Sequence, residues 1–176
     1  MLKNSIWLFA AFLAAWAGGM DWRYRRIPNW LTVPGLVFGI VLNTVVDGWP
    51  GAKSSLLGAG LGLLILLPFV LIRAVGGGDF KLIGALGAFL GPGRLINVLF
   101  GSMLIAGLMA LALVIYKRRF LQTMRNIGHM LGSFLRLRAP GAEVSLDNPE
   151  SVKVPFGVAV AVTVLLYGAQ HAFTGI

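Results

Sequence analysis

Long apolar segments constrain the fold of this chain more than any other feature of its sequence. A helix needs roughly 20 residues to cross the hydrocarbon core of a bilayer, and charged residues make up only 12% of this chain, about half the share usual in soluble domains. The sequence therefore predicts an all-α polytopic membrane protein with about six transmembrane helices, forming a single membrane-embedded domain over residues 1–176. The six segments fall at about residues 4–20, 31–46, 54–72, 80–91, 95–116 and 154–173.

The basic residues indicate how these segments are oriented. Of the 15 Lys and Arg residues, all but Lys3, Lys53 and Arg94 fall in the loops after the first, third and fifth segments. Loops rich in Lys and Arg stay in the cytoplasm, so both termini are predicted outside. The net charge of +9 is then explained by topology and by contact with anionic lipid, and no nucleic-acid partner is expected.

The loop over about residues 117–153 is the one long polar segment, and we expect it to be cytoplasmic. Its apolar residues recur at spacings of three and four between basic residues, which is typical of a basic amphipathic helix lying on an anionic leaflet. Docking of a substrate is an alternative role for this helix. The apolar positions are Phe120, Met124, Ile127, Leu131 and Phe134.

Glycines concentrate inside the apolar segments, where they allow helices to approach closely. We expect such small-residue faces in the third and fourth segments, at Gly58, Gly60, Gly62, Gly84, Gly87 and Gly91.

Acidic residues are rare, with only six in the chain. Asp21 ends the first apolar segment and Asp79 begins the fourth, so the predicted topology places both at the cytoplasmic face. An ionisable residue at the edge of a bilayer is costly and is therefore a functional hypothesis. Asp47 ends the second segment at the opposite face, where we interpret it as a turn residue in Asp-Gly-Trp-Pro.

Two carboxylates that share a water can hydrolyse an amide, one as base and the other as acid. Like charges in close contact cannot both ionise, so the pair divides these roles. Asp79 lies at a helix N-terminus, which favours negative charge, whereas Asp21 lies at a helix C-terminus. We therefore predict Asp79 as the base and Asp21 as the acid.

No cofactor or metal is predicted. Cysteine is absent, which rules out thiolate ligands. The histidines, His129 and His171, fall on opposite sides of the predicted membrane.

The residues around the two aspartates have ordinary structural explanations as well. Gly76, Gly77 and Gly78 are compatible with positive φ or a close backbone approach. Pro28 and Asn29 are suited to the start of the second helix, and Lys81 to reaching the interface. On these residues alone, a small proton- or cation-coupled transporter and a non-catalytic subunit of a pilus or secretion assembly remain alternatives.

Three sequence elements resemble the type IV prepilin peptidases, the GxGD class of membrane aspartyl proteases. They are Asp21 with Ile27-Pro28-Asn29, then Gly76-Gly77-Gly78-Asp79-Phe80-Lys81, and finally Lys153-Val154-Pro155-Phe156-Gly157-Val158-Ala159. They occur in the family's order and cover nearly the whole chain.

The resemblance implies cleavage of the leader peptide from a prepilin or pseudopilin at the cytoplasmic face of the bacterial inner membrane. It matches Asp21 and Asp79 to the catalytic pair, Gly76 and Gly78 to the motif glycines, and Lys81 to the motif lysine. Members that also N-methylate the new terminus carry an N-terminal extension with four cysteines. With no cysteine here, the chain looks like the short Flp/Tad-type form, and no methyltransferase activity is expected.

Overall fold

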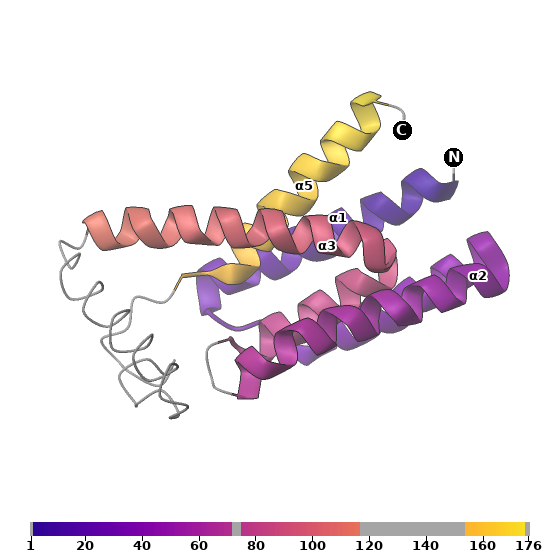
Figure 1. Ribbon diagram of the computed structural model, residues 1–176, viewed down its shortest axis with the longest axis horizontal. Coiled ribbons are helices and arrows are strands. Elements are labelled where there is room, and N and C mark those ends of the chain that lie inside the picture. The colour runs from indigo at the N-terminus through magenta and orange to yellow at the C-terminus, as the bar shows by residue number, and fades with distance from the viewer. Residues whose placement is uncertain (1, 72–74, 117–153, 175–176) are drawn as a thin grey trace.

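The computed structural model describes residues 2–71, 75–116 and 154–174, and nearly all of them are helical. Four helices follow one another: α1 (Leu2–Tyr24), α2 (Asn29–Leu71), α3 (Gly77–Tyr116) and α5 (Phe156–Thr174) (Figure 1). No strand occurs among these residues, which confirms the all-α prediction. The amphipathic helix predicted within 117–153 lies outside the described residues.

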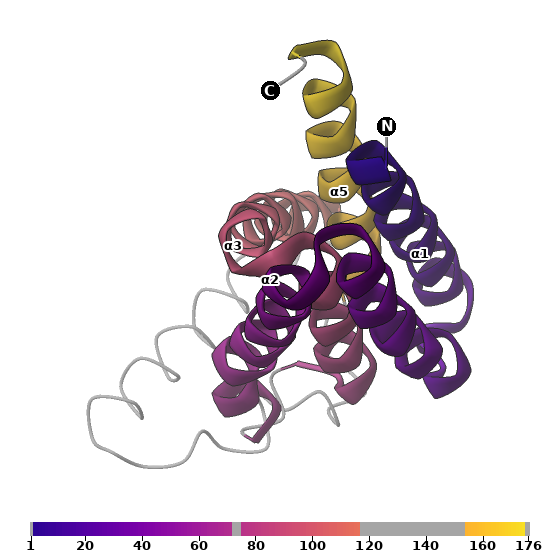
Figure 2. The ribbon, with the colours of Figure 1, turned by 90° about the vertical axis from the view of Figure 1, so that its right-hand side faces the viewer.

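Both long helices bend at a glycine. Gly48 in α2 has φ 63° and ψ −143°, and Gly91 in α3 has φ 71° and ψ 174°. Glycine adopts a positive φ without the steric cost that a Cβ atom brings. The two arms of α2 meet at a turn (Figure 2), and Asp47 directly precedes its bend, as expected of a turn residue. The bends fall between the second and third and between the fourth and fifth predicted apolar segments.

Side chains of α2 stabilise the break in α3. A helix that ends leaves its last carbonyl groups without intrahelical partners. The Asn43 side-chain amide donates to the carbonyl oxygens of Ala88 at 2.9 Å and Phe89 at 3.1 Å. The Ser55 hydroxyl, from the other arm of α2, donates to Ala88 at 2.7 Å. Both arms of α2 therefore hold the end of the first α3 segment.

Glycine contacts bring α2 and α3 close together. A Cβ atom on Gly58 would overlap the carbonyl oxygen of Gly87, and one on Gly62 would lie 2.9 Å from the Ile83 side chain. Gly84 is equally close to Leu63, at 2.8 Å. The predicted close approach is therefore present, but not at Gly60, where a Cβ atom would meet nothing within 4 Å.

Helix α5 packs beside α1, as both ribbon views show (Figures 1 and 2). A Cβ atom on Gly18 would lie 2.7 Å from that of Ala161 and 3.1 Å from the Gly157 carbonyl oxygen. This contact brings the first turn of α5 to the last turn of α1. The shared core behind it includes the fully buried side chains of Leu82, Leu86 and Val160.

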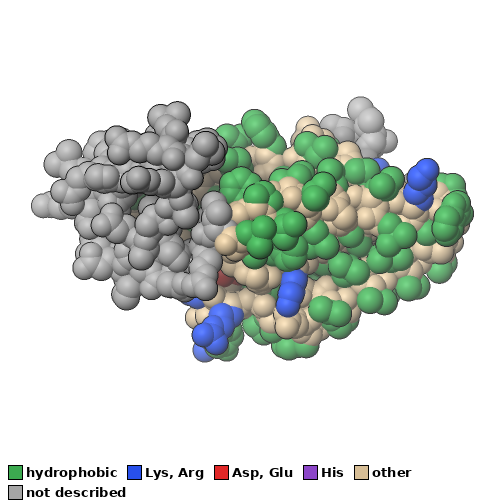
Figure 3. Space-filling model, turned by 60° about the horizontal axis from the view of Figure 1, so that its bottom comes forward, with side chains coloured by type: hydrophobic (Ala, Val, Ile, Leu, Met, Phe, Trp, Pro, Cys, Tyr) green, Lys and Arg blue, Asp and Glu red, His purple; other side chains and the backbone are tan. Residues whose placement is uncertain are grey.

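The outer surface of the bundle is apolar. Hydrophobic side chains are spread over the described part of the face shown in Figure 3, where Lys and Arg are few. Of the described helices, α2 and α3 are long and apolar enough to cross a membrane. Phe156–Gln170 of α5 forms a shorter apolar helix.

Candidate active site

Asp21 and Asp79 line one cavity of about 310 Å³ at the end of the bundle where α1 ends and α3 begins. We call it the aspartate cavity. Asp21 lies in the last turn of α1, and Asp79 lies in the first turn of α3. Asp47 lines a different cavity, so the structure brings together the two predicted acids and leaves the third apart. The other residues of the aspartate cavity are Arg25, Arg26, Ile27, Gly76, Gly77 and Gly78.

The Asp21 side chain is held by the start of α5. Asp21 is only 8% exposed, and its Oδ2 atom accepts a hydrogen bond from the main-chain N–H of Gly157 at 2.9 Å. This N–H belongs to the first turn of α5, where helix donors lack intrahelical partners. The positive end of the α5 dipole also favours negative charge there. Asp21 therefore lies at two helix ends, and the dipole of α1 alone does not describe its surroundings.

Gly157 is the site residue that sequence reasoning left without a role. A Cβ atom at this position would lie 2.9 Å from the Asp21 Cβ and 3.0 Å from its Oδ2. Such separations force something to shift, so a larger residue would displace the carboxylate. The signal in the sequence was a glycine two residues after Pro155, at the start of an apolar run.

Asp79 has an unused oxygen. Its Oδ1 atom is buried and has no hydrogen-bond partner within the described part of the chain. Leaving a buried acceptor unpaired costs about 1–3 kcal/mol, so such atoms in folded proteins call for an explanation. The described part of the fold therefore leaves one acceptor of Asp79 unsatisfied.

The glycines before Asp79 allow close packing, and the suggestion of positive φ at these positions is wrong. Among the described glycines, φ is positive at Gly48 and Gly91 only. A Cβ atom on Gly78 would lie 3.1 Å from the Cβ and carbonyl oxygen of Ile27, and one on Gly76 would lie 3.2 Å from Asp79 Oδ2. A Cβ atom on Gly77 would meet nothing within 4 Å. Space is therefore limited at Gly76 and Gly78 and open between them.

Lys81 and Asn29 join the starts of α3 and α2. The Lys81 ammonium donates to the Asn29 side-chain oxygen at 2.8 Å. Next to Asn29, the Pro28 carbonyl accepts from the N–H of Leu31 at 3.2 Å, which begins α2. None of these three predicted residues is among the described residues that line the aspartate cavity.

Arg25 and Arg26 line the cavity, although their sequence pattern indicated only a topological role. Arg25 has φ 54°, the left-handed conformation that commonly ends a helix. Its N–H donates to the Asp21 carbonyl at 2.9 Å. This helix end turns the chain so that both arginines reach the cavity.

Metal ligands do not cluster in the described residues. No group of three or more His, Cys, Asp or Glu side chains there is placed to hold an ion. His129 and the His171 side chain lie outside what the structure describes.

The fold and the site define a bundle of apolar helices in which two carboxylates face one cavity at the helix ends. The model of the type IV leader peptidase family matches residues 7–111, more than half of the chain. The chain belongs to the type IV leader peptidase family. The match includes both aspartates and the residues around them, and it ends before Gly157.

Two curated relatives carry the name prepilin leader peptidase/N-methyltransferase. The protein of Xanthomonas campestris pv. campestris is 30% identical over 109 residues, which cover 58% of this chain and 37% of the relative. The protein of Aeromonas hydrophila is 35% identical over 119 residues, which cover 61% and 41%. The match therefore spans well under half the length of either relative. No solved structure matches the chain.

Proposed function

We propose that this chain is a membrane aspartyl endopeptidase that removes the leader peptide from type IV prepilins at the cytoplasmic membrane face. The observation that carries the proposal is that Asp21 and Asp79 line a single cavity. They come from helices far apart in the sequence, and both fall within the residues that the family model matches.

In the proposed reaction, a water molecule between the two carboxyl groups attacks the scissile carbonyl carbon. One aspartate takes a proton from this water, while the other gives its proton to the carbonyl oxygen. The tetrahedral intermediate then collapses, and the leaving amine takes up the proton that came from the water. One proton shared by the pair meets the requirement that two adjacent carboxylates do not both ionise.

We assign Asp21 as the base and Asp79 as the acid, the reverse of the sequence-based expectation. The hydrogen bond from Gly157 supports a charged Asp21, because an N–H donor favours the ionised carboxylate. Carbodiimides react with protonated carboxyl groups, so dicyclohexylcarbodiimide followed by peptide mass mapping tests the assignment. We expect the adduct on Asp79, and an adduct on Asp21 instead would reverse the roles.

The lengths of α2 and α3 support six membrane crossings. Helix α2 has 43 residues and α3 has 40, or about 60 Å each at 1.5 Å per residue, twice the thickness of a hydrocarbon core. Each bends at an internal glycine, Gly48 in α2 and Gly91 in α3, which on this proposal gives two crossings per helix and six with α1 and α5. We propose the bacterial inner membrane, with both termini outside and the aspartate cavity facing the cytoplasm.

The chain has no cysteine, so single cysteines introduced one at a time report this topology through labelling with a membrane-impermeant maleimide. Lys53→Cys, at an exposed position beside the α2 bend, should be labelled from outside intact cells, whereas Arg26→Cys should be labelled only after the membrane is permeabilised. The opposite pattern would place the cavity on the outer side.

The proposed substrate is a prepilin or pseudopilin of the Flp/Tad type, with an apolar helix after its leader. Exposed apolar side chains on the bundle, such as Phe12, Val37 and Leu64, support lateral packing of such a helix. This packing would bring the leader junction to the aspartate cavity. We propose that residues 1–176 act as one domain, with an amphipathic helix within 117–153 on the anionic leaflet. The proposal concerns the peptidase activity alone.

Incubation of the purified protein with a prepilin from the same genome, followed by intact-mass analysis, tests the proposal. We expect one cut that releases the leader and that depends on both aspartates. Unchanged cleavage in either Asp→Asn variant would leave the transporter or the non-catalytic assembly subunit as the better account.

A further inference from the structure

The short helical segment that carries Asp79 lies in the middle of the bundle. It runs from Gly77 to the break in α3 at Gly91, and residues 82–91 are all buried. We call it the Asp79 segment. Ala88, near its far end, lies about 14 Å along the axis from Asp79 at 1.5 Å per residue. Because a closely packed interior transmits displacement, a shift at the far end of this segment moves Asp79 as well.

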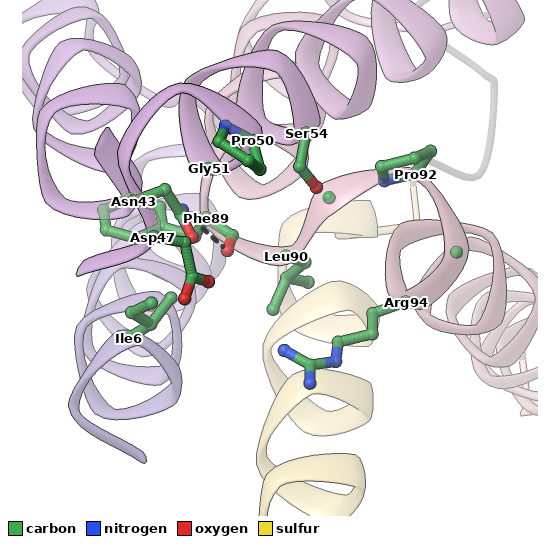
Figure 4. Close-up of a pocket in the computed structure, with 12 residues that line it drawn as sticks. Ile6, Asn43, Asp47, Pro50, Gly51, Ser54, Phe89, Leu90, Pro92 and Arg94 are labelled. Atoms are coloured by element: carbon green, nitrogen blue, oxygen red, sulfur yellow. Dashed lines mark hydrogen bonds between the residues drawn. The ribbon is translucent and has the colours of Figure 1, made fainter. Parts of the chain in front are cut away.

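A second cavity, of about 690 Å³, borders the far end of the Asp79 segment (Figure 4). Phe89, Leu90 and Gly91 line it, and it shares no lining residue with the aspartate cavity. Packing against neighbouring side chains normally limits the movement of a buried helix. Here the end of the segment faces open volume on one side, so packing on that side does not fix its position.

Hydrogen bonds from Asn43 hold the segment at this end. Asn43 belongs to the first arm of α2, before Gly48, and Figure 4 shows its side chain directed at Phe89. Its amide nitrogen donates to the carbonyl oxygens of Ala88 at 2.9 Å and Phe89 at 3.1 Å. These carbonyl groups lie in the last turn before the break, where a helix lacks intrahelical donors. Ser55, from the second arm of α2, adds a bond to Ala88 at 2.7 Å.

We propose that Asn43, assisted by Ser55, is a positioning residue for the reaction. Its hydrogen bonds fix the Asp79 segment and thereby set the separation of the Asp79 and Asp21 carboxyl groups. The inference rests on the proposed function, in which these two groups share a water molecule. Asn43 lines the second cavity and not the aspartate cavity, so it acts on the reaction only through Asp79. Placement is important because an error of about 1 Å in a catalytic group can lower the rate by about 100-fold.

Asn43→Leu tests the proposal, because leucine has a similar size and no amide donors. We expect kcat for leader cleavage to fall by about 10- to 100-fold, with KM unchanged because Asn43 does not contact the substrate. An unchanged kcat, or a change in KM alone, would overturn the proposal.

Thr44→Val is the matched control. The Thr44 hydroxyl donates to the Ile40 carbonyl within α2 at 2.7 Å, and Asn43 likewise donates to the Gly39 carbonyl within α2 at 3.1 Å. The control therefore loses a bond within α2 and keeps the bonds to α3. We expect its kcat and KM to equal those of the unmodified protein.

Ser55→Ala decides the question if Asn43→Leu does not fold. It removes one hydroxyl group, and Ala88 keeps its bond from Asn43. We expect a fall in kcat of about two- to tenfold, which corresponds to the loss of one neutral hydrogen bond. In that case, a kcat equal to that of Thr44→Val would overturn the proposal.

A thiol-bridging measurement separates this inference from the protease proposal, because it needs no peptide cleavage. The chain has no native cysteine, so Asp21→Cys and Asp79→Cys supply its only two thiols. We expect a short bifunctional reagent to bridge them roughly tenfold more slowly with Asn43→Leu than with Thr44→Val. Equal rates would overturn the positioning role even if the protein cleaves prepilin. Unequal rates without any cleavage would reject the protease and still support the link from Asn43 to position 79.

Discussion

The two ends of the bundle differ in how fully the hydrogen-bonding capacity of their polar groups is satisfied. At the end of the bundle where α2 and α3 bend, the carbonyl oxygens of Ala88 and Phe89 accept hydrogen bonds from Asn43 and Ser55. At the other end, Asp21 has one donor from α5, while Asp79 keeps a buried oxygen without a partner in the described chain.

This difference separates structural from functional polar residues. Asn43 and Ser55 satisfy carbonyl groups that the fold itself exposes, so their role is complete within the molecule. The Asp79 carboxylate retains an unfilled acceptor, Oδ1, in a cavity that it shares with a second acid. A buried carboxyl group with an unfilled acceptor, in a cavity shared with a second carboxyl group, is a candidate for a functional site.

The largest expected effect comes from removing either carboxylate. Asp21→Asn and Asp79→Asn should each lower prepilin cleavage by about 10³-fold or more, because general acid–base catalysis alone supplies 10²–10⁴-fold. The measurement is the rate of leader release by intact mass. Asp47→Asn, which removes an acid that lines the other cavity, is the matched control and should cleave at the rate of the unmodified protein. An equal loss of cleavage rate in all three variants would contradict a special role for Asp21 and Asp79.

A smaller effect is expected at Gly157. An alanine there would place its Cβ atom 2.9 Å from that of Asp21, which would displace the carboxylate. We expect cleavage to fall by about 10- to 100-fold, as for a misplaced catalytic group, with the helical circular dichroism spectrum unchanged. Gly77→Ala is the control, because a Cβ atom there meets nothing within 4 Å. If Gly157→Ala matched this control, the role of α5 in the site would be rejected.

The glycine contacts between α2 and α3 lie between the two ends of the bundle, and we expect them to contribute to its thermal stability. Gly58→Ala would overlap the backbone of Gly87, and such overpacking typically costs about 1–3 kcal/mol. Thermal unfolding in detergent should therefore begin at a lower temperature. Gly60→Ala has open space around its Cβ atom and should not lower it. A lower unfolding temperature in both variants would point to a general effect of glycine replacement.

The smallest effect is expected for the hydrogen bond between Lys81 and Asn29. Both residues are at least partly exposed, so Lys81→Met should cost only about 0.5–1.5 kcal/mol of stability. Asn29→Leu should cost no more in the Lys81→Met background, since the shared bond is already lost. Full additivity in this double-mutant cycle would show that the bond contributes nothing.

Much of the fold followed from the sequence, because apolar length and turn residues are local properties. The six apolar segments match the helical stretches between bends, and Gly48 lies where Asp-Gly-Trp-Pro indicated a turn. The prediction that Asp21 and Asp79 lie together came from the distribution of Lys and Arg among the loops and from the resemblance to the family. It did not require knowledge of packing.

The contacts within the site could not be predicted from the sequence. The bond from Gly157 to Asp21 spans 136 positions along the chain, and no local pattern encodes it. The suggestion of positive φ at Gly76–Gly78 was wrong. Gly76 and Gly78 lie instead where a Cβ atom would crowd Asp79 and Ile27, which are contacts that the local sequence does not reveal. The acid and base roles were predicted from each aspartate's own helix, whereas the Gly157 N–H at the start of α5 also donates to Asp21.

Proximity of the two carboxylates is the central claim, and the absence of native cysteine allows a direct measurement. Cysteines at positions 21 and 79, introduced by Asp21→Cys and Asp79→Cys, should be bridged by a short bifunctional thiol reagent. Intact mass would then show one reagent per chain. Asp47→Cys paired with Asp79→Cys should take up two separate reagents, since these positions line different cavities. Two separate reagents on positions 21 and 79 would contradict a shared site.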